Sequence, residues 1–124
     1  MAAMIPPLIQ VALGGAAGAA LRYVVGAQLA RPGFPVAVLT ANVVGSFAMG
    51  VLAVMLARAG LRAWEPLLLT GLLGGFTTFS AFSQETVTMV ERGAFGHAAL
   101  YVLLSVGLSI AALAVGAASA RVVA

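Results

Sequence analysis

Residues with the chemistry to hold or conduct an ion are concentrated in one stretch of an otherwise apolar chain. In this stretch, residues 74–80, two adjacent glycines are followed by two threonines and a serine. A glycine inside a helix costs roughly 1 kcal/mol relative to alanine, and β-branched threonines also fit a helix poorly. At membrane depth, non-helical backbone is tolerated only where it is buried or lines a hydrated cavity, and its freed carbonyls can bind a cation. We therefore expect a helix broken between Gly74 and Thr78; the alternative is a continuous helix with a glycine-rich packing notch.

Two phenylalanines beyond this stretch have the spacing of one helical face. Phe79 and Phe82 are three residues apart, and the hydroxyls of Thr78, Ser80 and Ser83 are distributed around them. Aromatic ring edges are electropositive, so the two rings and the hydroxyls together could receive an anion that has shed its water. Packing of the two rings in a helix interface is the other interpretation of the same spacing.

Polar side chains also recur every four residues in two other apolar segments. Asn42 and Ser46 share one stripe, and Tyr101, Ser105 and Ser109 share another. Small and hydroxyl residues are favoured where membrane helices touch, so the serines also fit simple helix packing. Asn42 points more strongly to a pathway because an unpaired amide in an apolar setting is costly.

Two charged residues within the apolar segments have open roles. Arg22 shares a stripe with Gly14 and Gly18, whose small size allows two backbones to approach closely. It precedes the loop residue Arg31 by about 12 Å of helix, so it either reaches the headgroups or attracts an anion to a vestibule. Glu85 follows Phe82 by one turn, and an acid there would repel an anion unless it is protonated or turned aside.

The elements that must position these residues are membrane helices. The chain is 63% hydrophobic and 7% charged, which leaves too little polar surface for a soluble globule. A bilayer core about 30 Å thick requires roughly 20 apolar residues per helix. We predict an all-α membrane protein, a single transmembrane domain over residues 1–124, with four helices at about 5–30, 36–57, 64–90 and 95–120.

The charges of the loops barely decide the orientation of these helices. Short loops that carry more arginine normally remain cytoplasmic. The six arginines divide almost evenly: Arg58, Arg62 and Arg121 on one side, and Arg31, Arg92 and, if it reaches outward, Arg22 on the other. A chain with so little bias could insert in both orientations and pair with an inverted copy of itself. A single orientation set by the slight excess is the alternative.

Several classes of function are excluded by what the sequence lacks. The net charge of +3 comes from scattered arginines rather than a basic patch, so we expect no nucleic acid partner. The absence of cysteine excludes disulfides and thiolate metal sites. No set of nucleophile, base and acid is visible, so we do not expect an enzyme.

Three segments resemble the CrcB/Fluc family of fluoride ion channels. They are residues 74–85, which resemble the hallmark segment of the family, residues 14–23, which look like its first helix, and residues 39–47, which look like its second. The resemblance covers nearly the whole chain in order. It implies a dual-topology antiparallel homodimer in the bacterial inner membrane, with two pores that export fluoride from the cytoplasm by passive electrodiffusion.

The resemblance also assigns roles to individual residues. A structural sodium ion at the dimer centre would be held by the backbone carbonyls of Gly74 and Thr77, and Arg22 would be the vestibule arginine. The fluoride pathway would be lined by eight side chains: Asn42, Thr78, Phe79, Ser80, Phe82, Ser83, Tyr101 and Ser105.

Two rival functions fit parts of the pattern. A small proton-coupled drug transporter can share the size and the dual topology, but it needs a carboxylate in its first span, where this chain has none. A non-conducting assembly subunit would need only the packing glycines, and it leaves Asn42 and the hydroxyl-rich break without a purpose.

Overall fold

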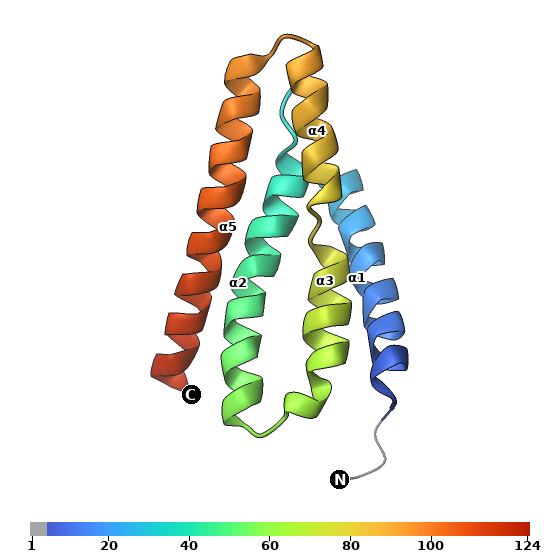
Figure 1. Cartoon of the computed structure of the whole chain (residues 1–124), viewed down its shortest axis with the longest axis vertical. Coiled ribbons are helices and arrows are strands. Elements are labelled where there is room, and N and C mark those ends of the chain that lie inside the picture. The colour runs from blue at the N-terminus through green and yellow to red at the C-terminus, as the bar shows by residue number, and fades with distance from the viewer. Residues whose placement is uncertain (1–4) are drawn as a thin grey trace.

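The computed structural model describes residues 5–124, so the first four residues of the predicted domain lie outside it. Every regular element in this part of the chain is a helix, as predicted (Figure 1). The first, second and last long helices are α1 (Pro7–Leu29), α2 (Val36–Arg58) and α5 (Phe95–Val123). The third segment is assembled from four pieces: η1 (Arg62–Trp64), η2 (Pro66–Leu73), α3 (Gly74–Phe76) and α4 (Ser80–Glu91).

Four segments are long and apolar enough to cross a membrane. They are Pro7–Leu29, Val36–Arg58, Arg62–Glu91 and Phe95–Val123, with mean hydropathies of 1.5, 1.9, 1.3 and 2.3. Each reaches the roughly 20 residues that a bilayer core requires. The protein is a multi-pass membrane protein, and the prediction of four spanning helices is confirmed.

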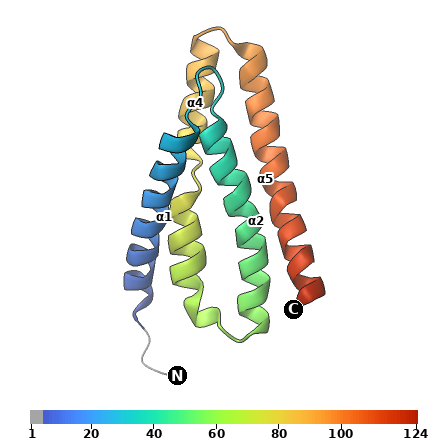
Figure 2. The same ribbon diagram turned by 180° about the vertical axis from the view of Figure 1, so that it is seen from behind.

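The segments run alternately up and down the long axis of the molecule. Both ends of the described chain and the α2–η1 connection lie at one end, and the α1–α2 and α4–α5 connections lie toward the other (Figures 1 and 2). Each connection contains a glycine with positive φ: Gly33 at 91°, Gly60 at 71° and Gly93 at 79°. This left-handed conformation is costly for other residues, so the three glycines fix where the chain reverses.

Glycines on α1 allow the third segment to approach its backbone closely. A Cβ atom on Gly14 would collide with the carbonyl oxygen of Leu67, and one on Gly18 with that of Leu72. Small residues permit such contacts between membrane helices. The close approach predicted for the Gly14–Gly18 stripe is therefore confirmed, and its partner is a segment of the same chain.

The third segment is interrupted, but later than predicted. Gly74 and Gly75 are helical, and the helix ends at Phe76; Thr77 is extended, with φ −88° and ψ 160°. The prediction that the break begins at Gly74 was wrong. A Cβ on Gly75 would lie 2.8 Å from the carbonyl oxygen of Gly15, so this glycine allows close packing on α1 rather than unwinding the helix. The interruption spans residues 77–79, and its depth in a membrane remains a prediction.

Candidate functional site

A cavity of about 340 Å³ lies where the interruption faces α2 and α5. Its polar lining comes from three elements: Asn42 and Ser46 on α2, Thr77 and Thr78 in the interruption, and Ser105 and Ser109 on α5. The two polar stripes predicted on the second and fourth spans thus face one space. Phenylalanine rings and aliphatic side chains complete the wall, so polar groups are few and set in an apolar surround.

Asn42 holds the interrupted backbone at Thr78 with two hydrogen bonds. Its Nδ2 donates to the Thr78 carbonyl oxygen at 2.9 Å, and its Oδ1 accepts from the Thr78 N–H at 2.7 Å. The carboxamide therefore supplies both partners that this residue would otherwise find within a continuous helix. Because Nδ2 carries two hydrogens, one N–H of Asn42 remains available to the cavity.

The hydrogen bonds of the interruption divert two N–H groups from their helical acceptors. In a continuous α-helix the Thr78 N–H would donate to Gly74 and the Ala81 N–H would donate to Thr77. The Thr78 N–H is held by Asn42, and the Ala81 N–H donates to the Thr78 hydroxyl at 3.1 Å. The carbonyls of Gly74 and Thr77 therefore lose their helical donors, and these are the two carbonyls that the resemblance assigned to sodium.

Arg22 reaches the interruption from α1. Its Nε donates to the carbonyl oxygen of Gly75 at 3.2 Å, near the end of α3. Cations are stabilised where helical carbonyls lack partners. This contact is a third role for Arg22, beside the headgroup and vestibule interpretations, that the sequence did not indicate.

The two predicted phenylalanines touch but occupy different environments. Their ring centroids are 5.3 Å apart, yet Phe82 is 7% exposed and Phe79 is 75% exposed. Both line the cavity, with Val106 and Ile110 of α5. The difference arises because Phe79 belongs to the interruption, whereas Phe82 lies inside α4 and packs against α5.

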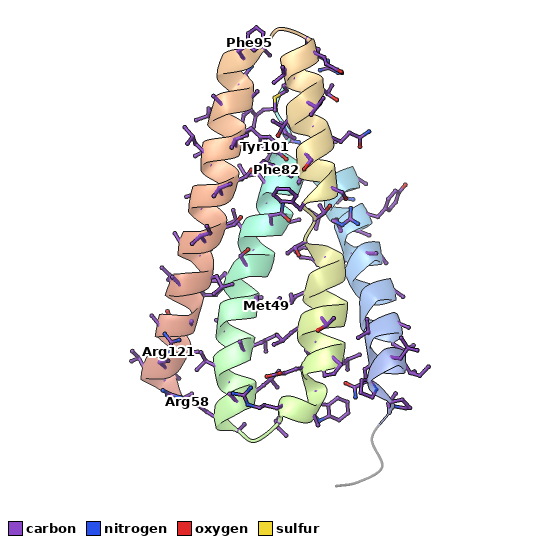
Figure 3. All side chains as sticks on the ribbon, in the orientation of Figure 1. Met49, Arg58, Phe82, Phe95, Tyr101 and Arg121 are labelled. Atoms are coloured by element: carbon purple, nitrogen blue, oxygen red, sulfur yellow. The ribbon has the colours of Figure 1, made fainter. Side chains whose placement is uncertain are left out.

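Tyr101 lies beside the cavity rather than on its wall. It is completely buried, and its ring centroid is 5.1 Å from that of Phe82 (Figure 3). Its hydroxyl donates to Glu85 Oε1 at 2.7 Å. Glu85 is thus turned toward Tyr101, one of the two arrangements that the sequence left open for an acid near an anion path.

Two serines of the cavity have no hydrogen-bond partner within the described part of the chain. They are Ser105 and Ser109, whose Oγ atoms are buried. Buried hydroxyls are almost always paired with protein or ordered water, so the two serines are exceptions among the described residues. Ser105 was predicted for the pathway; Ser46 and Ser109 were seen only as members of stripes.

The other predicted hydroxyls are engaged with the protein. Ser80 Oγ lies 3.2 Å from the Thr78 hydroxyl, and Ser83 Oγ donates to the Phe79 carbonyl at 2.8 Å. Neither serine is among the residues that line the cavity. The structure therefore gathers Asn42 and the residues around it into one site, and it leaves Ser80 and Ser83 at the edge of that site.

Sequence reasoning missed Gln10. This side chain is 1% exposed; its Nε2 donates to the Ile5 carbonyl at 2.8 Å and its Oε1 accepts from the Leu67 N–H at 3.2 Å. It satisfies a free N–H at the start of η2, where a helix has no internal acceptor. A lone amide in an apolar span was the available signal, the same one that identified Asn42.

A family model described as CrcB-like protein, Camphor Resistance (CrcB), matches residues 9–117. The chain belongs to the CrcB family. The match includes all of the cavity, the interruption and most of the four spans, so the predicted family membership is confirmed.

Relatives of this chain carry a name that states a function. One from Ruegeria sp. (strain TM1040) is 55% identical over 122 residues, which cover 95% of this chain and 97% of the relative. Another, from Cereibacter sphaeroides (strain ATCC 17029 / ATH 2.4.9), is 60% identical over 121 residues, covering 95% and 97%. Both are named fluoride-specific ion channel FluC. An ion channel is not an enzyme, in agreement with the prediction from the sequence.

Proposed function

We propose that the protein is a fluoride-selective ion channel, active as an antiparallel homodimer of two inverted chains. The observation that carries the proposal is the cavity lined by Phe82, Ser105 and Ser109, because the hydroxyls of the two serines have no hydrogen-bond partner within residues 5–124. Two relatives at 55% and 60% identity bear the name of a fluoride channel, which supports fluoride as the ion.

The cavity has the chemistry to replace the water of a small anion. Serine hydroxyls and the remaining N–H of Asn42 can donate hydrogen bonds, and ring edges carry partial positive charge. No lysine or arginine lines it. A full positive charge would hold fluoride too long, because conduction requires binding that is favourable enough for entry and weak enough for exit. Several weak donors in an apolar wall meet both conditions.

A second chain gives the exposed Phe79 ring a function. At 75% exposure on its own chain, Phe79 is available to a pathway that two chains form together. Two inverted copies would also bring their interrupted segments to a shared two-fold axis. The nearly even division of arginines between the two ends of the molecule supports insertion in both orientations.

Sodium fits the carbonyls that the interruption releases. Gly74 and Thr77 would hold it, because their helical donors are engaged by Asn42 and by the Thr78 hydroxyl. Unwound backbone carbonyls at membrane depth are known ligands for sodium. Two chains would contribute two carbonyls each to one ion at the dimer centre, where the ion would stabilise the assembly.

The proposed location is the bacterial inner membrane, where the potential drives an anion outward. Moving one elementary charge across 100 mV corresponds to about 2.3 kcal/mol. A passive pathway would therefore export fluoride by electrodiffusion without a coupled ion. The two pores of the dimer would have opposite orientations, and the same membrane potential would drive fluoride outward through both.

The experiment that tests the proposal is fluoride efflux from liposomes that contain the purified protein. We expect the wild type to release fluoride. The double variant Ser105→Ala/Ser109→Ala should release it at about one tenth of the wild-type rate or more slowly still, because a hydrogen bond to a charged group is worth about 1.5–3 kcal/mol. Ser119→Ala is the matched control, since Ser119 is an exposed serine of the same helix.

Two results would contradict the proposal. If the wild type released no more fluoride than protein-free liposomes, it would not be a fluoride channel. If the double variant conducted like Ser119→Ala, the cavity would not be the pathway. Loss of the two hydroxyls breaks no hydrogen bond within the described chain, so a slower efflux would not reflect lost folding contacts.

A further inference from the structure

A second cavity, of about 240 Å³, lies near the end of the molecule where the α1–α2 and α4–α5 connections are found. Its walls come from both connections and from the last turns of α4. Arg31 and Phe34 line it from the first connection, and Glu85, Met89 and Arg92 line it from α4 and the turn that follows. None of the functions derived above uses this space.

The charges around the second cavity favour an anion. Its lining includes two residues with guanidinium groups, Arg31 and Arg92, and one with a carboxylate, Glu85. The ion pair found within the described residues joins Arg62 and Glu65, which lie at the opposite end of the molecule from the second cavity. Arg31 Nη1 donates only to the neighbouring carbonyl of Ala30, at 3.2 Å. Both arginines therefore keep most of their donors free.

Glu85 does not neutralise the two arginines. Its Oε1 accepts the hydrogen bond of the Tyr101 hydroxyl at 2.7 Å, and neither arginine lies within 4 Å of its carboxylate oxygens. The carboxylate is thus directed toward α5. The second cavity keeps a positive balance on its loop side.

A single layer of aromatic side chains lies between the two cavities. Phe82 lines the first cavity and Glu85, one turn later on α4, lines the second. The Tyr101 ring contacts Phe82 at 5.1 Å and Phe34, which lines the second cavity, at 5.5 Å. Tyr101 thus connects a residue that lines the first cavity with one that lines the second, and its hydroxyl donates to Glu85 in the lining of the second.

We propose that the second cavity is an anion-binding antechamber in which Arg31 and Arg92 concentrate fluoride next to the Phe82–Tyr101 layer. This inference rests on the proposed function. A cleft with an excess of one sign of charge raises the local concentration of a counter-ion. Long arginine side chains from two connections bind it loosely, so the ion is collected there without being trapped before it enters the hydroxyl-lined cavity.

The test compares fluoride efflux from liposomes at several fluoride concentrations for charge-removing and charge-keeping variants. We expect Arg31→Gln/Arg92→Gln to raise the half-saturating fluoride concentration about three- to tenfold at an ionic strength of about 0.01 M, where charges act over about 30 Å. Arg31→Lys/Arg92→Lys should stay near the wild type. Arg121→Gln removes one arginine charge at the opposite end of the molecule (Figure 3) and should change nothing.

Salt and lipid composition separate the possible outcomes. At an ionic strength of about 1 M, where screening shortens the range to about 3 Å, the glutamine variant should approach the wild type. A glutamine variant equal to Arg121→Gln at low salt, while the wild type conducts, would overturn the antechamber and leave the proposed function intact. A wild type that does not conduct would overturn both.

A phospholipid headgroup is the rival ligand for the two arginines. The efflux measurement is therefore made in vesicles of phosphatidylcholine and of phosphatidylcholine with phosphatidylglycerol. The antechamber predicts the same rise in half-saturating fluoride in both. A defect confined to the vesicles with anionic lipid would show that Arg31 and Arg92 bind lipid phosphate, and it would overturn the proposal.

Discussion

The side chains at the cavity are of two kinds: some are engaged in hydrogen bonds within the protein, and others have unused hydrogen-bonding groups. Asn42 and Thr78 satisfy backbone groups, whereas the hydroxyls of Ser105 and Ser109 have no hydrogen-bond partner in the described part of the chain. Phe82 belongs to a buried cluster with Met89 and Tyr101. Phe79 touches Phe82, yet most of the Phe79 side chain is exposed on its own chain. The two rings should therefore respond differently when they are removed.

Truncating the two rings separates conduction from stability. We expect Phe82→Ala to lower the free energy of unfolding by about 3–5 kcal/mol, because it leaves a hole in the core. Phe79→Ala should leave the stability of the chain nearly unchanged, since its ring is 75% exposed. Both should slow fluoride efflux. Thermal unfolding in detergent and efflux from liposomes measure the two effects.

Phe95 provides the control for this pair. It is 65% exposed and lies at the start of α5, far from the interruption (Figure 3). Phe95→Ala should conduct like the wild type. Efflux through Phe79→Ala at the rate of Phe95→Ala would mean that the Phe79 ring is a packing or lipid-facing group and takes no part in the pathway.

At the scale of elements, the central feature is a third segment whose interruption is held open by a neighbouring helix. Thr78 accepts one hydrogen bond from Asn42 of α2 and donates another to it, and Arg22 of α1 donates to the Gly75 carbonyl of α3. Side chains from two helices thus replace backbone bonds lost over residues 77–79. The interruption is defined by its neighbours as much as by its own residues.

Much of this arrangement could be predicted from the sequence because it depends on local patterns. Apolar length gave the four spans, and the polar stripes of α2 and α5 predicted faces that the structure brings together. The start of the break could not be predicted, because Gly75 remains helical and serves a close approach to Gly15 of α1, a residue distant in the sequence. The partner of Asn42 and the role of Gln10 also depend on residues more than thirty positions away.

Substitutions of Asn42 test whether it keeps the interruption open. Asn42→Ala should lower the free energy of unfolding by about 1–3 kcal/mol, because it removes both partners of Thr78 and leaves polar groups unpaired. It should also let the Thr78 N–H return to the Gly74 carbonyl. We propose that sodium stabilises the wild type, measured as the difference in melting temperature between sodium and potassium buffers, and we expect the variant to lose most of this difference.

Asn42→Asp is the matched variant. A carboxylate still accepts from the Thr78 N–H but cannot donate to the Thr78 carbonyl, so the Gly74 carbonyl should stay free and the response to sodium should persist. Fluoride efflux should nevertheless fall, because the new charge repels the anion. An Asn42→Ala protein with the full sodium response would show that Asn42 does not control the carbonyls.

At the scale of the whole molecule, the single chain leaves parts of the site exposed. Phe79 and the Gly74 backbone lie at its surface, and the cavity opens to the outside. The arginines occupy both ends, with Arg58 bonded to the last turn of α5 at one end and Arg31 and Arg92 at the other. An inverted second chain would cover the exposed site and present the same charges to both sides of the membrane.

The most direct test of the account is the simultaneous efflux of fluoride and chloride from one preparation of liposomes. Vesicles that contain the wild-type protein are loaded with both potassium salts, and both anions are followed with ion-selective electrodes after valinomycin is added. We predict that fluoride leaves rapidly while chloride leaves no faster than from protein-free vesicles. Chloride efflux as fast as that of fluoride, or no fluoride efflux above the protein-free rate, would contradict the account.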